Sequence, residues 1–368
     1  MKLSHIFYGA ATGALMLAAA AGASAQSWPD QGFSIGGRTY MDVSSNEFKV
    51  NGAKSGAKNG YGFDVKRVYF QVDKKFNDLF SAQLQTDVSP MNQSSGSAAG
   101  QGLYVKKAFV KASFNPAFEV SLGSNELPWI PYAESIYGQR YLENTLLEQA
   151  NSGRATFGTS ADWGVHVGGV IPGGIFSYQV SMVNGKGYRD SSRSKTMDFE
   201  GRLSAKIEQW NFAVGGYTGK RGQSVYSGTT LVATPHNASR FNALAAFVGD
   251  RTKVGVEYFT ATDWAAGAIT DTTVGHTKGD KSDGTSLYGS YRVTPLYMLF
   301  ARVDAVKPSK TLSPQNKDDY YNFGVQTSPL KGITLSALVK HDKLDTYAGA
   351  VRTRTEFTEV GIFTEIRY

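Results

Sequence analysis

Apolar and polar residues alternate along most of this chain, and a period of two predicts β-strands with one apolar and one polar face. The clearest example is the stretch of residues 197–207. Residues 63–76 and 80–88 repeat the pattern on both sides of a tight turn at Asn77 and Asp78. The pattern therefore predicts a succession of antiparallel hairpins.

The connections between the predicted strands alternate between short and long. The short turns are predicted at Asn77-Asp78, Asn115-Pro116, 172–174, Gln209-Trp210, Gly249-Asp250, Thr294-Pro295 and Ser328-Pro329. The long connections are predicted at 89–102, 124–161, 185–196, 220–239, 263–284, 307–319 and 343–354. About 16 strands, with 14 and 18 also open, would form an all-β transmembrane antiparallel barrel with short periplasmic turns and long extracellular loops.

The chain ends in one more alternating segment, residues 357–368, whose last residue is the aromatic Tyr368. Such an ending resembles the signal that the outer-membrane barrel assembly machinery reads. Because backbone groups cannot bond to water inside a bilayer, an open sheet edge is not tolerated there. We therefore expect residues 33–41 to pair with residues 357–368. A soluble β-sandwich or propeller also alternates, but it does not require every short turn to lie at one end.

The N-terminal residues have the features of a secretory signal peptide. Lys2 precedes a short apolar stretch, and small residues lead to Ala25, which predicts a signal peptide at residues 1–25 and a barrel domain at 26–368. An exported barrel is predicted to lie in the bacterial outer membrane, where the membrane lipid contacts its outer face. The chain has no cysteine and therefore no disulfides. The net charge of +7 is spread along the chain rather than gathered in a run, which argues against nucleic-acid binding.

The longest predicted connection, residues 124–161, follows the fifth strand. It is rich in aromatic and charged residues, unlike a flexible linker, and long unstructured loops are usually functional. We expect it to fold into the barrel lumen as a constriction, with aromatic residues on the wall and charged residues facing water. The candidates for the water-facing set are Glu134, Arg140, Glu143, Glu148 and Arg154. The alternative is an external loop packed against a neighbouring subunit.

Several segments resemble the phosphate-selective porin O/P family over nearly the whole mature chain. They are GFDVKRVYF at 62–70, SNELPWIPYAESIYGQRYLE at 124–143, FGTSADWGV at 157–165, VNGKGYR at 183–189 and DFEGR at 198–202. The resemblance implies a barrel of about 16 strands, usually a homotrimer, in which lumen-facing basic residues guide anions past inserted loops. It also implies passive transport of small hydrophilic or anionic solutes, without a cofactor.

Strand parity places ten basic and nine acidic residues toward the lumen. The basic set is Arg67, Lys107, Lys111, Arg202, Lys206, Lys253, Arg292, Arg302, Lys340 and Arg367, and the acidic set is Asp73, Asp87, Glu119, Asp198, Glu200, Glu257, Asp304, Glu359 and Glu365. Anion passage requires excess positive charge in the lumen, so this near balance favours general diffusion over phosphate specificity. Each such charge can instead belong to a structural ion pair between strands.

An outer-membrane barrel can also be an enzyme of the phospholipase or protease type, so catalytic patterns matter. The histidines are scattered, and no HExxH, G-x-S-x-G or P-loop motif occurs, which predicts neither a catalytic site nor a metal site. His166 lies on the polar face of its strand near Asp162 and could recruit a serine. A solvated lumen histidine is the simpler interpretation, and a non-enzymatic pore is the prediction.

Overall fold

The computed structural model describes residues 32–56, 59–90, 101–194, 196–222, 226–227, 230–231, 237–264 and 279–368. The predicted signal peptide at 1–25 lies outside these residues. In the described part of the chain, no helix is long and apolar enough to cross a membrane.

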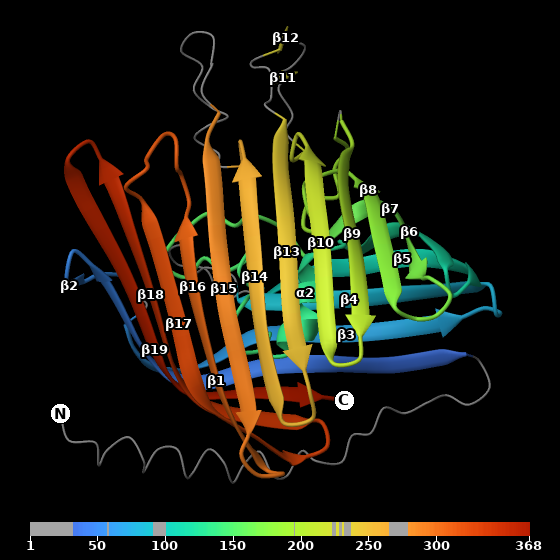
Figure 1. Cartoon of the computed structure of the whole chain (residues 1–368), viewed down its shortest axis with the longest axis horizontal. Helices are drawn as coiled ribbons and strands as arrows, with labels where there is room; N and C mark the ends of the chain where they lie inside the picture. Colours follow the sequence, from blue (N-terminus) through green and yellow to red (C-terminus); the bar gives the residue numbers. More distant parts are fainter. Residues whose placement is uncertain are drawn as a thin grey trace.

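The main sheet has 17 strands, all in antiparallel pairs, and one of them, β2 (Ala53–Lys54), is a two-residue piece beside β1. The other 16 (17 minus one) form a closed barrel (Figure 1). They are β1 (Phe33–Val50), β3 (Gly60–Lys75), β4 (Phe80–Pro90), β5 (Gln101–Asn115), β6 (Phe118–Glu126), β7 (Ala161–Val170), β8 (Phe176–Val183), β9 (Asp198–Ile207), β10 (Trp210–Gly219), β13 (Ala238–Val248), β14 (Thr252–Thr262), β15 (Lys281–Arg292), β16 (Tyr297–Lys307), β17 (Lys317–Leu330), β18 (Ile333–Ala348) and β19 (Val351–Arg367). A short pair, β11 (Tyr226–Ser227) and β12 (Thr230–Leu231), lies outside the barrel sheet.

The first and last strands close the barrel, as expected for a sheet in lipid. β1 pairs with β19 from Arg38 opposite Arg367 to Val50 opposite Thr355. The C-terminal Tyr368 extends the pairing, because its carbonyl accepts a hydrogen bond from the N–H of Gly37 at 2.9 Å. Closure leaves no free edge among the long strands, which removes the cost of unpaired backbone groups in the membrane.

One predicted long loop is wrong. Residues 343–354 belong to β18 and β19, which meet in a tight turn at Gly349 and Ala350. Alternation fades there because both faces of the hairpin carry polar residues, yet the backbone ladder continues. An Arg354–Asp345 pair with two hydrogen bonds of 2.8 Å joins the two strands. Similarly, the turn predicted at Ser328-Pro329 lies within β17, and the chain reverses after Leu330.

The alternation of side chains assigns the two faces of the wall. On β16, outward residues such as Leu299 and Val303 are exposed, whereas the inward Phe300, Arg302 and Asp304 are buried. The outward apolar residues form the surface that lipid covers, and the inward residues contact the loop described next.

Candidate functional site

The 34-residue connection between β6 and β7, residues 127–160, lies inside the barrel. It contains α2 (Ile130–Tyr137), which begins with Pro131 in its first turn and ends at Gly138, whose φ of 77° favours glycine. Figure 1 places α2 behind β13, between the two sides of the barrel wall. The connection follows the fifth barrel strand, as the sequence predicts.

Trp129 anchors the start of this loop and is fully buried. Its indole N–H donates to Glu257 on β14 at 2.7 Å, and its backbone N–H donates to Glu200 on β9 at 3.0 Å. Gly215 on β10 makes room for the ring, since a Cβ there would lie 2.7 Å from it. The tryptophan is therefore held by three wall strands.

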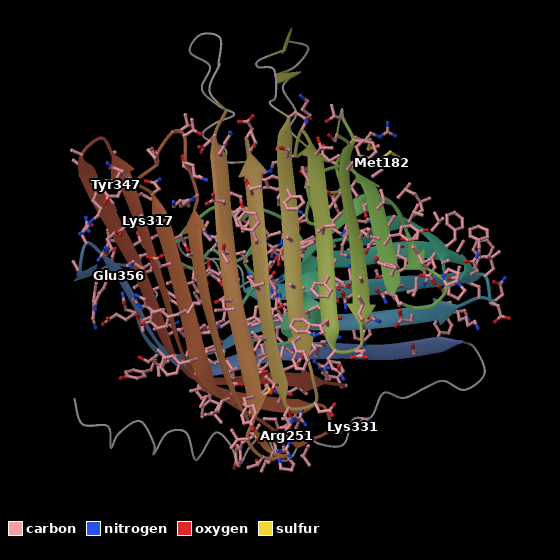
Figure 2. All side chains as sticks on the ribbon, in the orientation of Figure 1. Met182, Arg251, Lys317, Lys331, Tyr347 and Glu356 are labelled. Atoms are coloured by element: carbon pink, nitrogen blue, oxygen red, sulfur yellow. The ribbon has the colours of Figure 1, made fainter. Side chains whose placement is uncertain are left out.

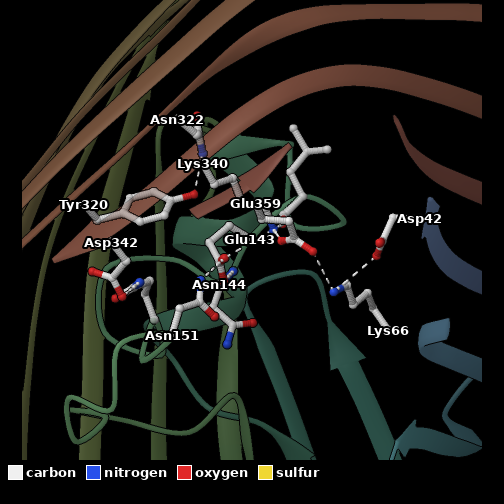
Figure 3. Close-up of polar contacts among 12 residues, drawn as sticks. Asp42, Lys66, Glu143, Asn144, Asn151, Tyr320, Asn322, Lys340, Asp342 and Glu359 are labelled. Carbon is white, nitrogen blue, oxygen red and sulfur yellow. Dashed lines mark hydrogen bonds and ion pairs between the residues drawn. The ribbon is translucent and has the colours of Figure 1, made fainter. Parts of the chain in front are cut away.

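The second half of the loop is held through its backbone carbonyls. Arg302 on β16 donates to the carbonyl of Asn144 at 2.7 Å, and Lys340 on β18 donates to that of Leu142 at 2.8 Å. Figure 3 shows Lys340 between the loop and Glu359, which pairs in turn with Lys66 at 3.0 Å. These wall cations form part of the framework that holds the loop inside the barrel.

Two of the five loop residues expected to face water are buried instead. Arg154 pairs with Asp318 of β17 at 3.3 Å and donates to the carbonyl of Leu146 at 3.1 Å. Glu143 lies 3.5 Å from Lys340 and accepts hydrogen bonds from Asn151 and from the backbone of Asn144. Both carboxylate-cation pairs fix the loop to the wall, because an unpaired charge there would be costly to bury.

The other three loop residues remain partly exposed and lie together. Arg140 is 2.5 Å from Glu134 and 3.9 Å from Glu148. Burial alone would lower the pKa of Arg140, but the nearby carboxylates raise it well above its ordinary value, so the guanidinium stays charged. Burial raises the pKa of Glu148, and the charge of Glu134 raises it further.

The wall facing this group carries two β-bulges that strand parity cannot foresee. The register of β1 with β3 shifts at Lys66, and that of β4 with β5 shifts at Lys106. A bulge adds one residue to one strand and re-aims its side chain. As a result Lys66 and Arg67, and likewise Lys106 and Lys107, all point into the lumen.

Lys106 differs from the other bulge cations because it forms no ion pair with a carboxylate among the described residues, although the charge of Glu134 acts on it. It is buried, its ammonium lies 3.5 Å from the hydroxyl of Tyr69, and it stands over the rings of Tyr69 and Tyr188. By contrast, Arg67 pairs with Asp87. In the sequence, each bulge coincides with two adjacent basic residues, Lys66-Arg67 and Lys106-Lys107. Strand parity assigned the two members of each pair to opposite faces of the wall.

The remaining predicted wall charges have structural partners or lie at the rim of the lumen. Lys107 pairs with Glu126 at 2.5 Å, Lys111 pairs with Glu119 at 3.2 Å, and Arg302 pairs with Asp304. Arg202 donates to the carbonyl of Pro128 at 3.0 Å and stacks on Tyr132, which keeps the ring half-buried. Lys206 is exposed near the short-turn end of β9. Most wall charges therefore neutralise one another or hold the loop.

His166 does contact a serine, but the group lacks the features of a catalytic triad. Its Nδ1 lies 2.8 Å from the hydroxyl of Ser181, and its Nε2 lies 3.4 Å from the carbonyl of Gly123. Both side chains are buried, and Asp162 instead accepts hydrogen bonds from the backbone N–H groups of Trp163 and Gly185. In the part of the chain that the structure describes, no carboxylate bonds to the imidazole to orient it, as a Ser-His-Asp mechanism requires.

Comparison with known proteins identifies the family. The model of the phosphate-selective porin O and P family matches residues 33–317, which is more than half of the chain. The chain belongs to this family. Its family and its barrel fold place this porin in the bacterial outer membrane, where it forms a channel for small solutes. No curated protein sequence matches the porin.

Solved structures share the fold of this porin at low sequence identity. An anion-selective porin from Comamonas acidovorans matches with a TM-score of 0.61 and 14% identity, over 92% of this chain and 100% of that one. The outer-membrane channel DcaP of Acinetobacter baumannii matches with a TM-score of 0.61 and 12% identity, over 94% of this chain and 100% of that one. A trimer form of OmpT, an outer membrane protein of Vibrio cholerae, matches with a TM-score of 0.55 and 13% identity, over 91% of this chain and 99% of that one.

Proposed function

We propose that this porin is a general diffusion pore with a mild preference for small anions, and that the loop at 124–161 forms its constriction. The observation that carries the anion preference is Lys106, a buried cation that lies against the rings of Tyr69 and Tyr188 and forms no ion pair among the described residues. A charge in a confined passage acts on ions far more strongly than one on the rim.

Two further cations lie near the same tyrosines. Arg189, in the connection between β8 and β9, stands over the rings of Tyr104 and Tyr188, and Arg38 on β1 lies opposite Tyr69. Neither has an ion-pair partner in the described part of the chain. Against these three cations, the loop contributes Glu148, whose nearest cation is Arg140 at 3.9 Å. The proposed anion preference rests on these three cations, and it requires that they outweigh Asp42, Asp64 and Glu359, whose cation partners are Lys66 and Lys340.

The experiment is a reversal-potential measurement in a KCl gradient across a planar bilayer. Lys106→Gln should move the reversal potential toward cation preference, whereas Lys54→Gln should change it little, because Lys54 lies exposed on the rim where salt screens it over about 8–10 Å. An unchanged potential in Lys106→Gln would contradict the proposal. A barrel enzyme, the alternative, should give no steady ion-conducting steps.

Phosphate specificity is a separate question with its own test. Most lumen cations are paired or hold the loop, so chloride and phosphate should both pass, and phosphate should reduce the chloride current only weakly. Strong inhibition by low phosphate concentrations would instead indicate a dedicated phosphate site.

Assembly and export complete the proposal. The trimer form of the Vibrio cholerae neighbour supports a homotrimer, which chemical cross-linking of the native membrane should detect. The alternating C-terminal strand supports recognition by the barrel assembly machinery. The apolar N-terminal stretch supports a signal peptide, and sequencing the N-terminus of the mature protein should find Gln26 first.

A further inference from the structure

The outer surface of the barrel carries a set of charges near the ends of β15 to β19 that adjoin the long loops. The cations at this end, called here the outer cationic band, are Lys281, Lys307, Lys317, Lys343, Arg352 and Arg354. Figure 2 labels Lys317 here and Arg251 and Lys331 at the opposite end of the barrel. Since long loops are extracellular in such barrels, the band faces the outer leaflet of the membrane.

Three carboxylates near the band have cation partners, and a fourth, Glu356 on β19, lies opposite Lys343. Asp319 pairs with Lys343 at 3.0 Å, and Asp345 pairs with Arg354 through two hydrogen bonds. Asp283 pairs with Lys310, beyond the end of β16. Lys281, Lys307, Lys317 and Arg352 form no ion pair among the described residues, although Asp283 lies opposite Lys307 and Asp345 lies opposite Lys317 in the strand register.

Two of these cations lie at the adjoining ends of neighbouring strands. Val306 on β16 pairs with Asp318 on β17, and Lys307 and Lys317 are the next residues, at the end of β16 and the start of β17. Both side chains are exposed, and both neighbours in their strands are buried in the barrel, which puts the two ammonium groups on the outer face. Like charges in this position repel each other, and an anion between them would turn repulsion into attraction.

Apolar residues continue the same face below the band. Val303, Tyr321 and Phe323 are 51%, 43% and 54% exposed, as expected for side chains that contact lipid chains. Tyr321 lies four residues from Lys317, about 13 Å along the strand. A molecule with acyl chains beside Phe323 would therefore carry its head group at the height of Lys317.

We propose that the outer cationic band binds the phosphate groups of an outer-leaflet glycolipid, with Lys307 and Lys317 as its centre. The acyl chains of that lipid lie on the apolar face formed by Val303, Tyr321 and Phe323. Phosphate oxygens accept charge-assisted hydrogen bonds from both ammonium groups, which relieves their mutual repulsion. This surface is on the outside of the barrel and separate from the solute passage.

The test is native mass spectrometry of the detergent-purified full-length porin, titrated with lipid A that carries two phosphates. Each cation near an anionic head group contributes roughly fivefold in affinity, so the double variant Lys307→Gln/Lys317→Gln should bind about 25-fold more weakly. The matched control is Arg251→Gln/Lys331→Gln, which removes two cations from the opposite rim and should bind lipid A like the unmodified porin. Dephosphorylated lipid A should bind weakly to all three proteins.

Several outcomes would overturn the proposal. Equal binding of lipid A by the double variant and the control would exclude the two lysines, and equal binding of both lipids would exclude the phosphates. Loss of trimers in the double variant without loss of lipid A binding would identify the band as a subunit contact. Single-channel conductance and heat-modifiable migration should stay normal in both variants, which separates this test from that of the pore.

Discussion

Removing the indole of Trp129 should release the start of the loop from the barrel wall. The side chain is fully buried, and truncation of a buried tryptophan costs about 3–5 kcal/mol. The change Trp129→Ala also leaves Glu257 without the donor that lies 2.7 Å away, which adds about 1–3 kcal/mol. The loss should fall on the loop rather than on the barrel, because Trp129 lies in the connection between β6 and β7 and not in a strand.

The expected result is a larger single-channel conductance and weaker ion selectivity in planar bilayers. Residues 127–138 should also become sensitive to proteases, whereas the segment held by Arg302 and Lys340 stays in place. Trp129→Phe keeps the ring and loses only the hydrogen bond, so its effect should be smaller. Trp210→Ala, which removes an indole from the lipid-facing surface, should leave conductance unchanged.

Unchanged conductance in a folded Trp129→Ala barrel would refute this reasoning. It would mean that Trp129 does not hold the loop, or that the loop does not limit the current. Heat-modifiable migration on gels reports whether the barrel is folded. The conductance of Trp129→Ala is compared with that of the unmodified porin only when this migration is unchanged.

Three further predictions concern the wall, the loop charges and the closing strand. Leu84→Arg puts a charge into lipid and should lower the free energy of unfolding, measured by denaturant titration, by roughly 2–4 kcal/mol. Gln83→Arg, on the lumen face, should lower it little, and equal losses would reject the face assignment. Because the pKa of Glu148 is raised, acidification should neutralise it before ordinary glutamates and shift the reversal potential toward anions, and Glu148→Gln should remove that part of the pH response. Deleting residues 366–368 removes the pairing of Ile366 with Thr39 and of Arg367 with Arg38 between the last and first strands. The exported protein should then fail to insert into the membrane, and normal amounts of folded barrel would contradict this prediction.

The amino-acid sequence determines the wall of this porin. A period of two assigns each residue to the lipid face or the lumen face wherever the two faces differ in polarity. Because unpaired backbone groups at a sheet edge are costly in lipid, the first strand, β1, must then pair with the last, β19. The length and composition of residues 124–161 favoured a loop folded into the lumen over an external loop packed against a neighbouring subunit. These features are local or follow from the solvent, so no knowledge of distant contacts is needed.

Tertiary structure decided the features that depend on partners far away in the chain. The bulges at Lys66 and Lys106 shift which residues face the lumen, and a single extra residue leaves almost no trace in an alternating pattern. Arg154 is buried because Asp318, 164 positions later, supplies its counter-charge. The hairpin of β18 and β19 continues past the point where alternation fades, because backbone hydrogen bonds hold strands together whatever their side chains face.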